Sequence, residues 1–446
     1  MVKYEPVISL NNFNLVSNTA LEFRLKDIDD VFGSDLEFDL RELYLEWMTP
    51  LGDFSLGKQI ITWGSASENN PTDNISPYNY YYLFSMGKAR KEGILSLNSN
   101  IYLSNTKLNL VLIPYHNSHF IPLNDTEFPI SIPIEDPSTN KPLTITNEQI
   151  MELKEPLEYG ISITYPFPSL DISASYFSGY DRAFSFFGAN LWTGANSNPD
   201  AIKTDIVLSY RKTNMFGLGF SGIIDNFSLK GDFAYFQTDD NINNILDSTL
   251  YRYWESGVQE IKLQCKELNE ASSWDLDFKE IDCNNDAKFN NSQVIDNSAD
   301  YLQYTFELEY SPTYDFSIIS QFSVSELLNI GQADSIITSR GTIMFDPLDF
   351  FIPGIGLSNT FISSNSLSIS ARKLFSDMGL ELSYTSMFDL DERGSLHGVG
   401  LEYEIFKNTN LLIELTKIFD NEKIPMNPFT GMKDFSRILF ELKYFY

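Results

Sequence analysis

The sequence of 446 residues has no long hydrophobic run, few basic residues, three histidines and two cysteines. No stretch of about 18 consecutive apolar residues occurs, which excludes a transmembrane helix. The 31 basic residues are outnumbered by 61 acidic ones, and a net charge of −30 repels the phosphates of nucleic acids. So few histidines and cysteines give no zinc-ligand cluster, so no metal site is expected. A membrane protein with this sequence must be a β-barrel, which satisfies its backbone within lipid.

The N-terminal residues and the cysteines bear on the compartment. Residues 1–10 show neither the basic nor the apolar region of a signal peptide, so the chain is either cytoplasmic or a mature chain with an added methionine. Cys265 and Cys283 lie 283 − 265 = 18 residues apart in a polar stretch. This spacing favours a disulfide formed in an oxidising compartment, with two unpaired thiols as the alternative.

Strict alternation of apolar and polar residues recurs along the chain. Residues 302–310 carry leucine, tyrosine or phenylalanine at every even position, with glutamine, threonine or glutamate between them. The segments 157–165, 227–235 and 399–405 show the same period of two. Such a period over about 9 to 11 residues is typical of a membrane strand with one apolar and one polar face. Short turns alternate with long connections, as in outer-membrane barrels with short periplasmic turns and long extracellular loops.

The predicted fold is therefore all-β: a transmembrane, antiparallel, up-and-down β-barrel of about eighteen strands, forming a single domain over 1–446. An even count puts both chain ends in the periplasm. Sixteen strands is the alternative, because the division of 203–224 and 350–373 rests on loop parity alone. The long connections 64–91, 117–155 and 239–298 are candidate plugs, and we expect 239–298 to form an extracellular lid. The predicted strands are 13–25, 38–48, 53–63, 92–104, 107–116, 156–166, 170–180, 203–224, 226–238, 299–310, 314–326, 333–345, 350–361, 365–373, 377–388, 396–407, 410–420 and 434–446.

The last strand carries a separate indication of a barrel. Ile438, Phe440, Leu442, Tyr444 and Tyr446 alternate on one face. This pattern resembles the C-terminal insertion signal of bacterial outer-membrane proteins. The resemblance implies the barrel-assembly machinery as a partner, and a location in the outer membrane among its lipids and lipopolysaccharide. An ordinary amphipathic edge strand would show the same local pattern.

A run of motifs departs from plain alternation, and two of them centre on Trp63-Gly64 and Asn70-Pro71-Thr72-Asp73. The earlier ones are Arg41-Glu42-Leu43-Tyr44-Leu45 and Gly57-Lys58-Gln59. Over residues 41–77 this order resembles a family of Gram-negative outer-membrane porin-like barrels of largely unassigned function. It is more distantly similar to alginate-export and substrate-selective porins. The glycines and the proline indicate close backbone approach and a fixed turn. We expect Trp63, Asn70, Pro71 and Asp73 to lie on a loop that folds inward and constricts the channel, with packing on the rim as the alternative.

The polar faces of the predicted strands line the lumen of such a barrel. Acidic residues exceed basic ones on these faces, which predicts a mild preference for cations. Aromatic residues such as Tyr44, Tyr102, Phe177 and Phe236 either form a sliding track for solutes or fill space. Lys58 and Gln59 interrupt an apolar face, so at least one is expected to point inward. The candidate pore-lining residues are Glu42, Tyr44, Glu46, Lys58, Glu158, Lys230, Asp232, Glu307, Glu309, Arg372, Glu381, Glu402, Glu404, Glu414, Arg437 and Glu441.

These features predict an outer-membrane, porin-like channel for passive diffusion of small hydrophilic or weakly amphipathic solutes. A transporter of fatty acids or lipids with a periplasmic partner is the first alternative, and a surface adhesin is the second. Catalysis is not expected, because the histidines fit no catalytic arrangement. No cofactor is expected; acidic runs near Asp27 and Asp389 hold oxygen ligands suited to Ca²⁺ but no complete binding loop. The protein is expected to be a monomer or a homotrimer.

Overall fold

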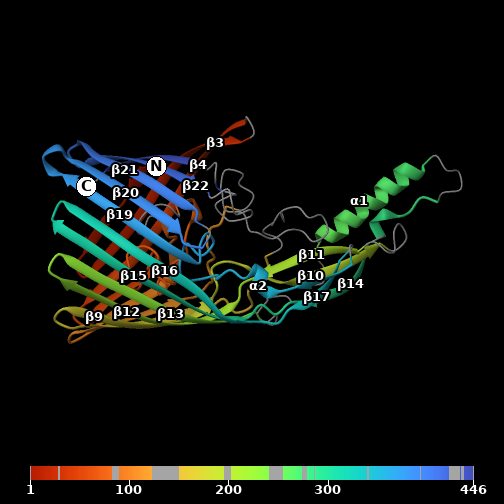
Figure 1. Cartoon of the computed structure of the whole chain (residues 1–446), viewed down its shortest axis with the longest axis horizontal. Coiled ribbons are helices and arrows are strands. Elements are labelled where there is room, and N and C mark those ends of the chain that lie inside the picture. Colours follow the sequence, from red (N-terminus) through yellow and green to blue (C-terminus); the bar gives the residue numbers. More distant parts are fainter. Residues whose placement is uncertain are drawn as a thin grey trace.

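The protein folds into a closed antiparallel β-barrel with an extension on one side (Figure 1). The structure is a computed structural model. No helix in the described residues is long and apolar enough to cross a membrane. The predicted all-β barrel of about eighteen strands is confirmed. The described residues are 2–28, 31–82, 90–122, 150–194, 202–240, 255–273, 279–285, 287–338, 341–391, 393–420, 432 and 436–444.

Most of the barrel wall is a series of strands in which each pairs antiparallel with the next wall strand along the chain. The sheet holds 18 strands in the described residues, and two of them, β1 and β2, share one position; the other sixteen form this series. These are β3 (Phe13–Ile28), β4 (Val31–Thr49), β5 (Gly52–Gln59), β6 (Ile94–Leu103), β7 (Thr106–Ile113), β8 (Glu158–Pro166), β9 (Leu170–Tyr180), β12 (Lys212–Ile224), β13 (Phe227–Asp239), β15 (Ala299–Thr313), β16 (Phe316–Ile330), β19 (Asn365–Phe375), β20 (Leu380–Asp389), β21 (Ser395–Phe406), β22 (Thr409–Phe419) and β23 (Ser436–Tyr444).

The first residues of the chain close the wall. Strands β1 (Val2–Tyr4) and β2 (Val7–Leu10) both pair antiparallel with β3, and Pro6 lies in the break between them. Strand β1 also pairs with β23, and this pair is parallel, with Val2 opposite Leu442. The wall therefore has 16 + 1 = 17 strand positions. The expectation that residues 1–12 lie outside the wall, and that the strand count is even, is corrected.

The two faces of the wall differ as the alternation predicts. On β4, Leu43, Leu45 and Trp47 are exposed on the outer face, whereas Glu42 and Glu46, at alternate positions, are half-buried and face inward. A belt of exposed apolar side chains around a closed barrel is the outer surface of a membrane-spanning protein. In the predicted insertion signal, the exposed side chains of Phe440 and Leu442 share this outer face; the side chain of Tyr444 and all of Tyr446 lie outside the described part.

Three predicted wall strands are corrected. The segment 203–224 contains two strands, β11 (Ile202–Ser209) and β12, and β11 belongs to a separate sheet. Residues 333–345 form a hairpin of their own, β17 (Asp334–Thr338) and β18 (Gly341–Phe345), followed by the short helix α2 (Pro347–Phe350). Residues 351–361 form bends rather than a strand. Alternation indicates a half-buried strand but not the sheet that it joins, which explains the first two errors.

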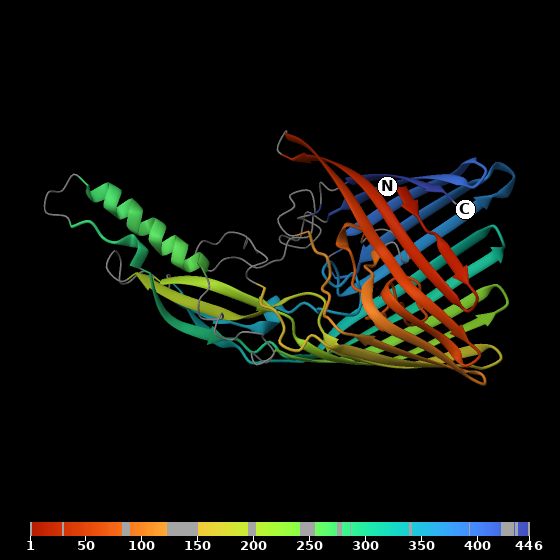
Figure 2. The same cartoon turned by 180° about the vertical axis from the view of Figure 1, so that it is seen from behind.

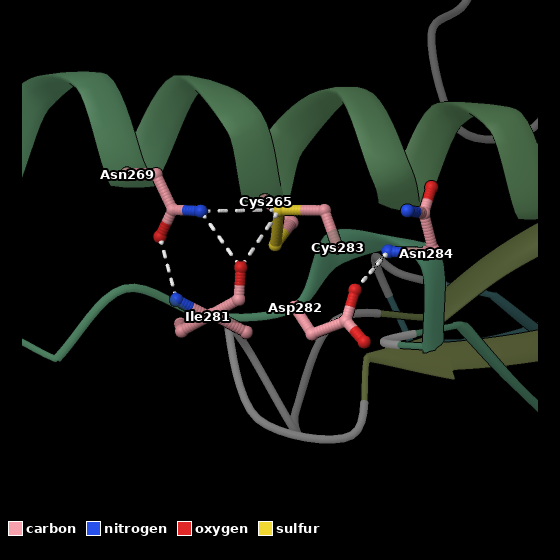
Figure 3. The surroundings of a disulfide bond; sticks show 6 residues. All are labelled: Cys265, Asn269, Ile281, Asp282, Cys283 and Asn284. Carbon is pink, nitrogen blue, oxygen red and sulfur yellow. Dashed lines mark hydrogen bonds between the residues drawn. A yellow bond between two sulfur atoms is a disulfide. The ribbon is translucent and has the colours of Figure 1, made fainter.

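The extension lies beyond one rim of the barrel (Figures 1 and 2). Its sheet has the order β11-β10-β14, where β10 is Ser185–Gly194 and β14 is Ala287–Val294. The helix α1 (Glu255–Ser272) is joined to the short turn η6 (Cys283–Asn285) by the predicted disulfide, Cys265–Cys283, which is confirmed (Figure 3). Asn269 bonds both backbone groups of Ile281 beside it. Part of the predicted lid 239–298 therefore forms this extension, and closure of the mouth stays a prediction.

Candidate functional site

Inside the barrel, residues 60–82 form a first inner segment that leaves the end of β5. At the start of this segment, a β-bulge in β4 leaves Arg41 unpaired beside Glu42, because Asn18 pairs with Glu42 and Thr19 with Leu40. The Glu42 carboxylate accepts the Ile60 amide at 2.9 Å, and the Arg41 guanidinium donates to the Lys91 carbonyl at 2.9 Å. The bulge therefore holds both ends of the loop that contains the segment.

The backbone of the first inner segment bonds to polar side chains on the opposite wall. Asp232 on β13 accepts the amides of Ser65 at 2.9 Å and Ala66 at 2.7 Å. Glu307 on β15 accepts the amide of Ser67 at 2.7 Å. Gln321 on β16 continues the row by accepting the amide of Asn69 at 3.0 Å. Because these side chains come from three neighbouring strands, the segment lies across the lumen and not along its rim.

The predicted constriction residues bond to one another. Asn70 accepts from the Thr72 amide at 2.9 Å and donates to the Trp63 carbonyl at 3.2 Å. The Trp63 amide in turn donates to Asp73 at 2.9 Å. Gly64 has a φ of 83°, a left-handed conformation that favours glycine. Pro71 lies within this loop and is buried. The W-G and N-P-x-D motifs thus form one structural unit, which explains why they occur together.

Two wall glycines leave room for the segment. A Cβ atom added at Gly160 would lie 2.5 Å from the Trp63 ring, and one at Gly217 would lie 2.8 Å from the Thr72 methyl group. The Trp63 indole also donates to Asn109 on β7 at 2.7 Å. A continuous apolar core surrounds this contact: Ile61, Trp63, Ile75, Ile94, Val111, Ile113, Phe177, Met215, Ala234, Phe236, Tyr301 and Ile355. Phe177 and Phe236 therefore fill space here, where the sequence left a solute track open.

Buried charged side chains stabilise the part of this region next to the end of β9. Arg182 and Glu158 form an ion pair at 2.8 Å, with side chains 1% and 0% exposed. His116 lies 2.8 Å from the same carboxylate. His119 accepts the Tyr78 amide at 2.9 Å, and burial lowers the pKa of this imidazole well below its ordinary value, which suits a neutral acceptor. His116 and His119 therefore position the loop. The sequence alone gave these two histidines no role.

A second inner segment, residues 351–363, packs against the first. The Leu357 amide donates to Gln303 on β15 at 2.9 Å. Ser358 donates to Asn69 at 2.8 Å, and its carbonyl accepts the Tyr80 hydroxyl at 3.2 Å. Sequence reasoning missed this segment by assigning it to the wall. Its signals were Pro353, Gly354 and Gly356, which disfavour a strand interior.

The other side of the lumen holds a cavity of about 450 Å³. Residues of β1, β15, β16 and β19–β23 line it from the wall, and Tyr82, in the turn η1 (Tyr80–Tyr82), lines it from the first inner segment. The charged side chains that line it are Lys3, Glu309, Arg372, Glu381, Glu402, Glu414, Glu441 and Lys443. We call the inner segments, strands β6–β9, β12 and β13, and the parts of β15 and β16 that contact the first inner segment the sealed side. The wall residues that line the cavity are the cavity side.

Ion pairs on the cavity side join different strands of the wall, neighbouring strands in two cases and β21 with β23, across β22, in the third. Lys443 bonds Glu402 at 2.8 Å, and Lys3 bonds Glu441 at 2.8 Å. Arg372 bonds Glu381, and its side chain is 61% exposed. Arg437 joins wall and segment, because it contacts Glu414 at 3.2 Å and donates to the Tyr81 carbonyl at 3.0 Å.

The remaining candidate pore-lining residues take other positions. Tyr44 and Glu46 face inward on β4, where Glu46 accepts the Asn14 side chain at 2.8 Å. Lys230 bonds Glu307 at 2.9 Å on the sealed side. Glu404 is exposed beside the turn at Gly379. Lys58 pairs with Leu43, on the outer face, so Gln59 is the inward residue of that pair.

A closed antiparallel barrel with an apolar exterior is the architecture of proteins of the bacterial outer membrane, and this places the chain there. No group of three or more His, Cys, Asp or Glu that could hold a metal ion occurs within the described ranges. Asp389 and Asp391, in one of the acidic runs, accept hydrogen bonds from Ser363 and Asn365.

Comparisons with known proteins find similarity at the level of solved structures. No protein-family model matches the sequence, and no curated protein matches it. OccAB3 of Acinetobacter baumannii is similar with a TM-score of 0.42 and 10% identity over 99% of this chain and 90% of that chain. OccD3 (OpdP) of Pseudomonas aeruginosa has the same TM-score and identity over 99% of this chain and 83% of that chain. OccK8 (OprE) of Pseudomonas aeruginosa has a TM-score of 0.40 and 10% identity over 94% and 86%. At these scores the similarity carries no argument about function, which rests on the barrel itself.

Proposed function

We propose that this barrel is a porin-like channel through which small hydrophilic or weakly amphipathic solutes diffuse across the outer membrane, with a mild preference for cations. The observation that carries the proposal is a cavity of about 450 Å³, lined by eight charged side chains, inside a closed, apolar-coated wall. Polar interiors of this kind are water-filled in porins. A volume of this order also accommodates a small solute, since ligand cavities measure about 300–1,000 Å³.

The charge balance around the cavity supports the cation preference. Five glutamates line it, namely Glu309, Glu381, Glu402, Glu414 and Glu441, against the three bases Lys3, Arg372 and Lys443. An excess of carboxylates along a pore favours cations. Reversal potentials of the purified protein in planar bilayers, under a salt gradient, test this directly. Anion selectivity would contradict it, and absence of any conductance would contradict the channel itself.

The first inner segment is proposed to constrict the channel. It bonds to β13, β15 and β16 through Asp232, Glu307 and Gln321, so it occupies lumen that would otherwise carry solutes. Deletion of residues 66–78 is expected to increase single-channel conductance. Heat-modifiable migration on gels verifies that the deletion variant still forms a barrel.

A matched control for this deletion lies outside the lumen. Replacing Cys265 and Cys283 by serine alters the extension only, because the disulfide joins α1 to η6 beyond the rim. Conductance of this variant is expected to equal that of the unmodified protein. A deletion variant that folds and conducts like the unmodified protein would refute the constriction.

A further inference from the structure

We infer that ions and solutes pass along one side of the barrel, through the cavity and beside Tyr82, and that, among the inward carboxylates of the described residues, those of the cavity side set the selectivity. This inference rests on the proposed channel function. It divides the inward carboxylates into two classes, which the alternation of the sequence treats as one.

Carboxylates on the sealed side are fully used by the protein. Asp232 is 0% exposed and accepts two backbone amides and the Thr72 hydroxyl. Glu307 is 1% exposed and accepts from Ser67, Gln321 and Lys230. A buried carboxylate whose oxygens already accept several bonds has no face to offer to a passing ion.

The apolar core blocks passage behind these carboxylates. Trp63 lies against Gly160, and Phe236 stacks on Tyr301 with ring centroids 4.5 Å apart. Packed interiors of this kind leave few voids larger than a water molecule. A hydrated ion therefore cannot pass between the inner segments and the strands of the sealed side.

Carboxylates on the cavity side are held less tightly. Glu381 and Glu402 remain about a quarter exposed at the side chain, each with 24%, and each pairs with a long basic side chain of another strand. Solvent-exposed ion pairs contribute only about 0–1 kcal/mol. Because such pairs contribute little, a passing cation can compete with the basic partner, even at Glu402, which also accepts from Asn410 at 2.7 Å.

The turn η1 bounds the cavity on the side of the first inner segment. Tyr82 lines the cavity, donates its hydroxyl to Glu22 on β3, and lies beneath the Arg41 guanidinium at 5.9 Å. The adjacent Tyr81 carbonyl is held by Arg437 of β23. These contacts hold η1 to β3 and β23, and Tyr82 is the residue through which the first inner segment lines the cavity that solutes would cross.

Introduced thiols test the route. The two cysteines of the chain are joined in a disulfide, so a single introduced cysteine is the only reactive thiol. Ser370 lines the cavity, whereas Ser323, on the neighbouring strand, is 2% exposed beside Thr305. A charged methanethiosulfonate reagent is expected to remove most of the conductance of Ser370→Cys and none from Ser323→Cys. Equal block of the two variants, or no block of Ser370→Cys, would overturn the route.

Selectivity provides an independent test. The cation-to-anion permeability ratio, measured from reversal potentials, is expected to fall in Glu402→Gln and further in Glu381→Gln/Glu402→Gln. The ratio is expected to stay unchanged in Asp232→Asn, where the amide oxygen keeps accepting from the inner segment. A shift in Asp232→Asn as large as in Glu402→Gln would refute the division. Unchanged selectivity in a conducting Glu381→Gln/Glu402→Gln variant would refute the inference and leave the channel function standing, whereas absence of conductance in the unmodified protein would refute the channel function itself.

Discussion

Both sides of the lumen contain arginine–glutamate ion pairs, but the pair on the sealed side is buried and the pair on the cavity side is exposed to solvent. Arg182 and Glu158 form an ion pair on the sealed side with side chains 1% and 0% exposed, and Arg372 and Glu381 form one on the cavity side with 61% and 24% exposed. A buried pair is costly to break because the remaining charge stays uncompensated, whereas an exposed pair contributes little. The comparison teaches that an inward charge can hold the structure or meet the solute, according to what covers it.

The largest expected effect comes from breaking the buried pair. Arg182→Gln leaves Glu158 without its cation and removes donors to the carbonyls of Ile75 and Asn117, so the free energy of unfolding is expected to fall by about 3–5 kcal/mol. The matched variant Arg372→Gln, on the cavity side, is expected to change it by no more than about 1 kcal/mol. Urea unfolding in lipid vesicles measures both. Equal losses in the two variants would remove the basis of the comparison.

A smaller effect is expected from filling the glycine contacts. In Gly160→Ala the new methyl group lies 2.5 Å from the Trp63 ring, so the first inner segment must shift and about 1–3 kcal/mol of stability is lost. Gly400→Ala is the counterpart on the cavity side, where the nearest atom is the Ser383 hydroxyl, which can rotate away. Its change is expected within about 0.5 kcal/mol. Thermal unfolding followed by circular dichroism compares them, and an unaffected Gly160→Ala would mean that Trp63 is not closely packed.

A pH-dependent effect is expected where the sealed side continues beyond the rim. Burial raises the pKa of Asp240, just beyond β13, to about 6, although Asn297 and Ser298 donate to it. A carboxyl whose folded pKa is raised binds its proton more tightly when folded, so it contributes stability at low pH that is lost as the pH rises through about 6. Asp240→Asn is expected to flatten this part of the stability profile between pH 4 and 7, as measured by urea unfolding. An unchanged profile would place Asp240 in water.

The wall strands were predictable because their signal is local. The alternation in 302–310 and 399–405 identifies inward and outward residues, and β15 and β21 keep that assignment. The motifs around Trp63 and Asn70 likewise predict an inward loop from a short, local run of residues. Its partners could not be predicted, because Ser65 meets Asp232 over 167 residues and Ser67 meets Glu307 over 240.

The same limit explains the errors. Nothing near Glu307 in the sequence distinguishes it from Glu402, since the difference is a loop from a distant part of the chain that covers one and not the other. The alternation of short turns and long loops predicts a wall strand at 350–361, although Gly354 and Gly356 disfavour a strand interior there. Its polarity predicts that Lys58 points inward, but its register with Leu43 places it on the outer face.

The joint between β1 and β23 has a consequence for how the barrel assembles. Every other joint of the wall links strands that are neighbours in the hairpin series, and β12 and β13 pair at thirteen positions across a two-residue turn. The β1–β23 joint has two residue pairs and links positions 442 − 2 = 440 residues apart. Pairings between distant segments form slowly, since chain entropy is lost before contacts compensate it. We therefore expect the wall to grow as an open curved sheet, with the meeting of the first strand and the last as its final and slowest step.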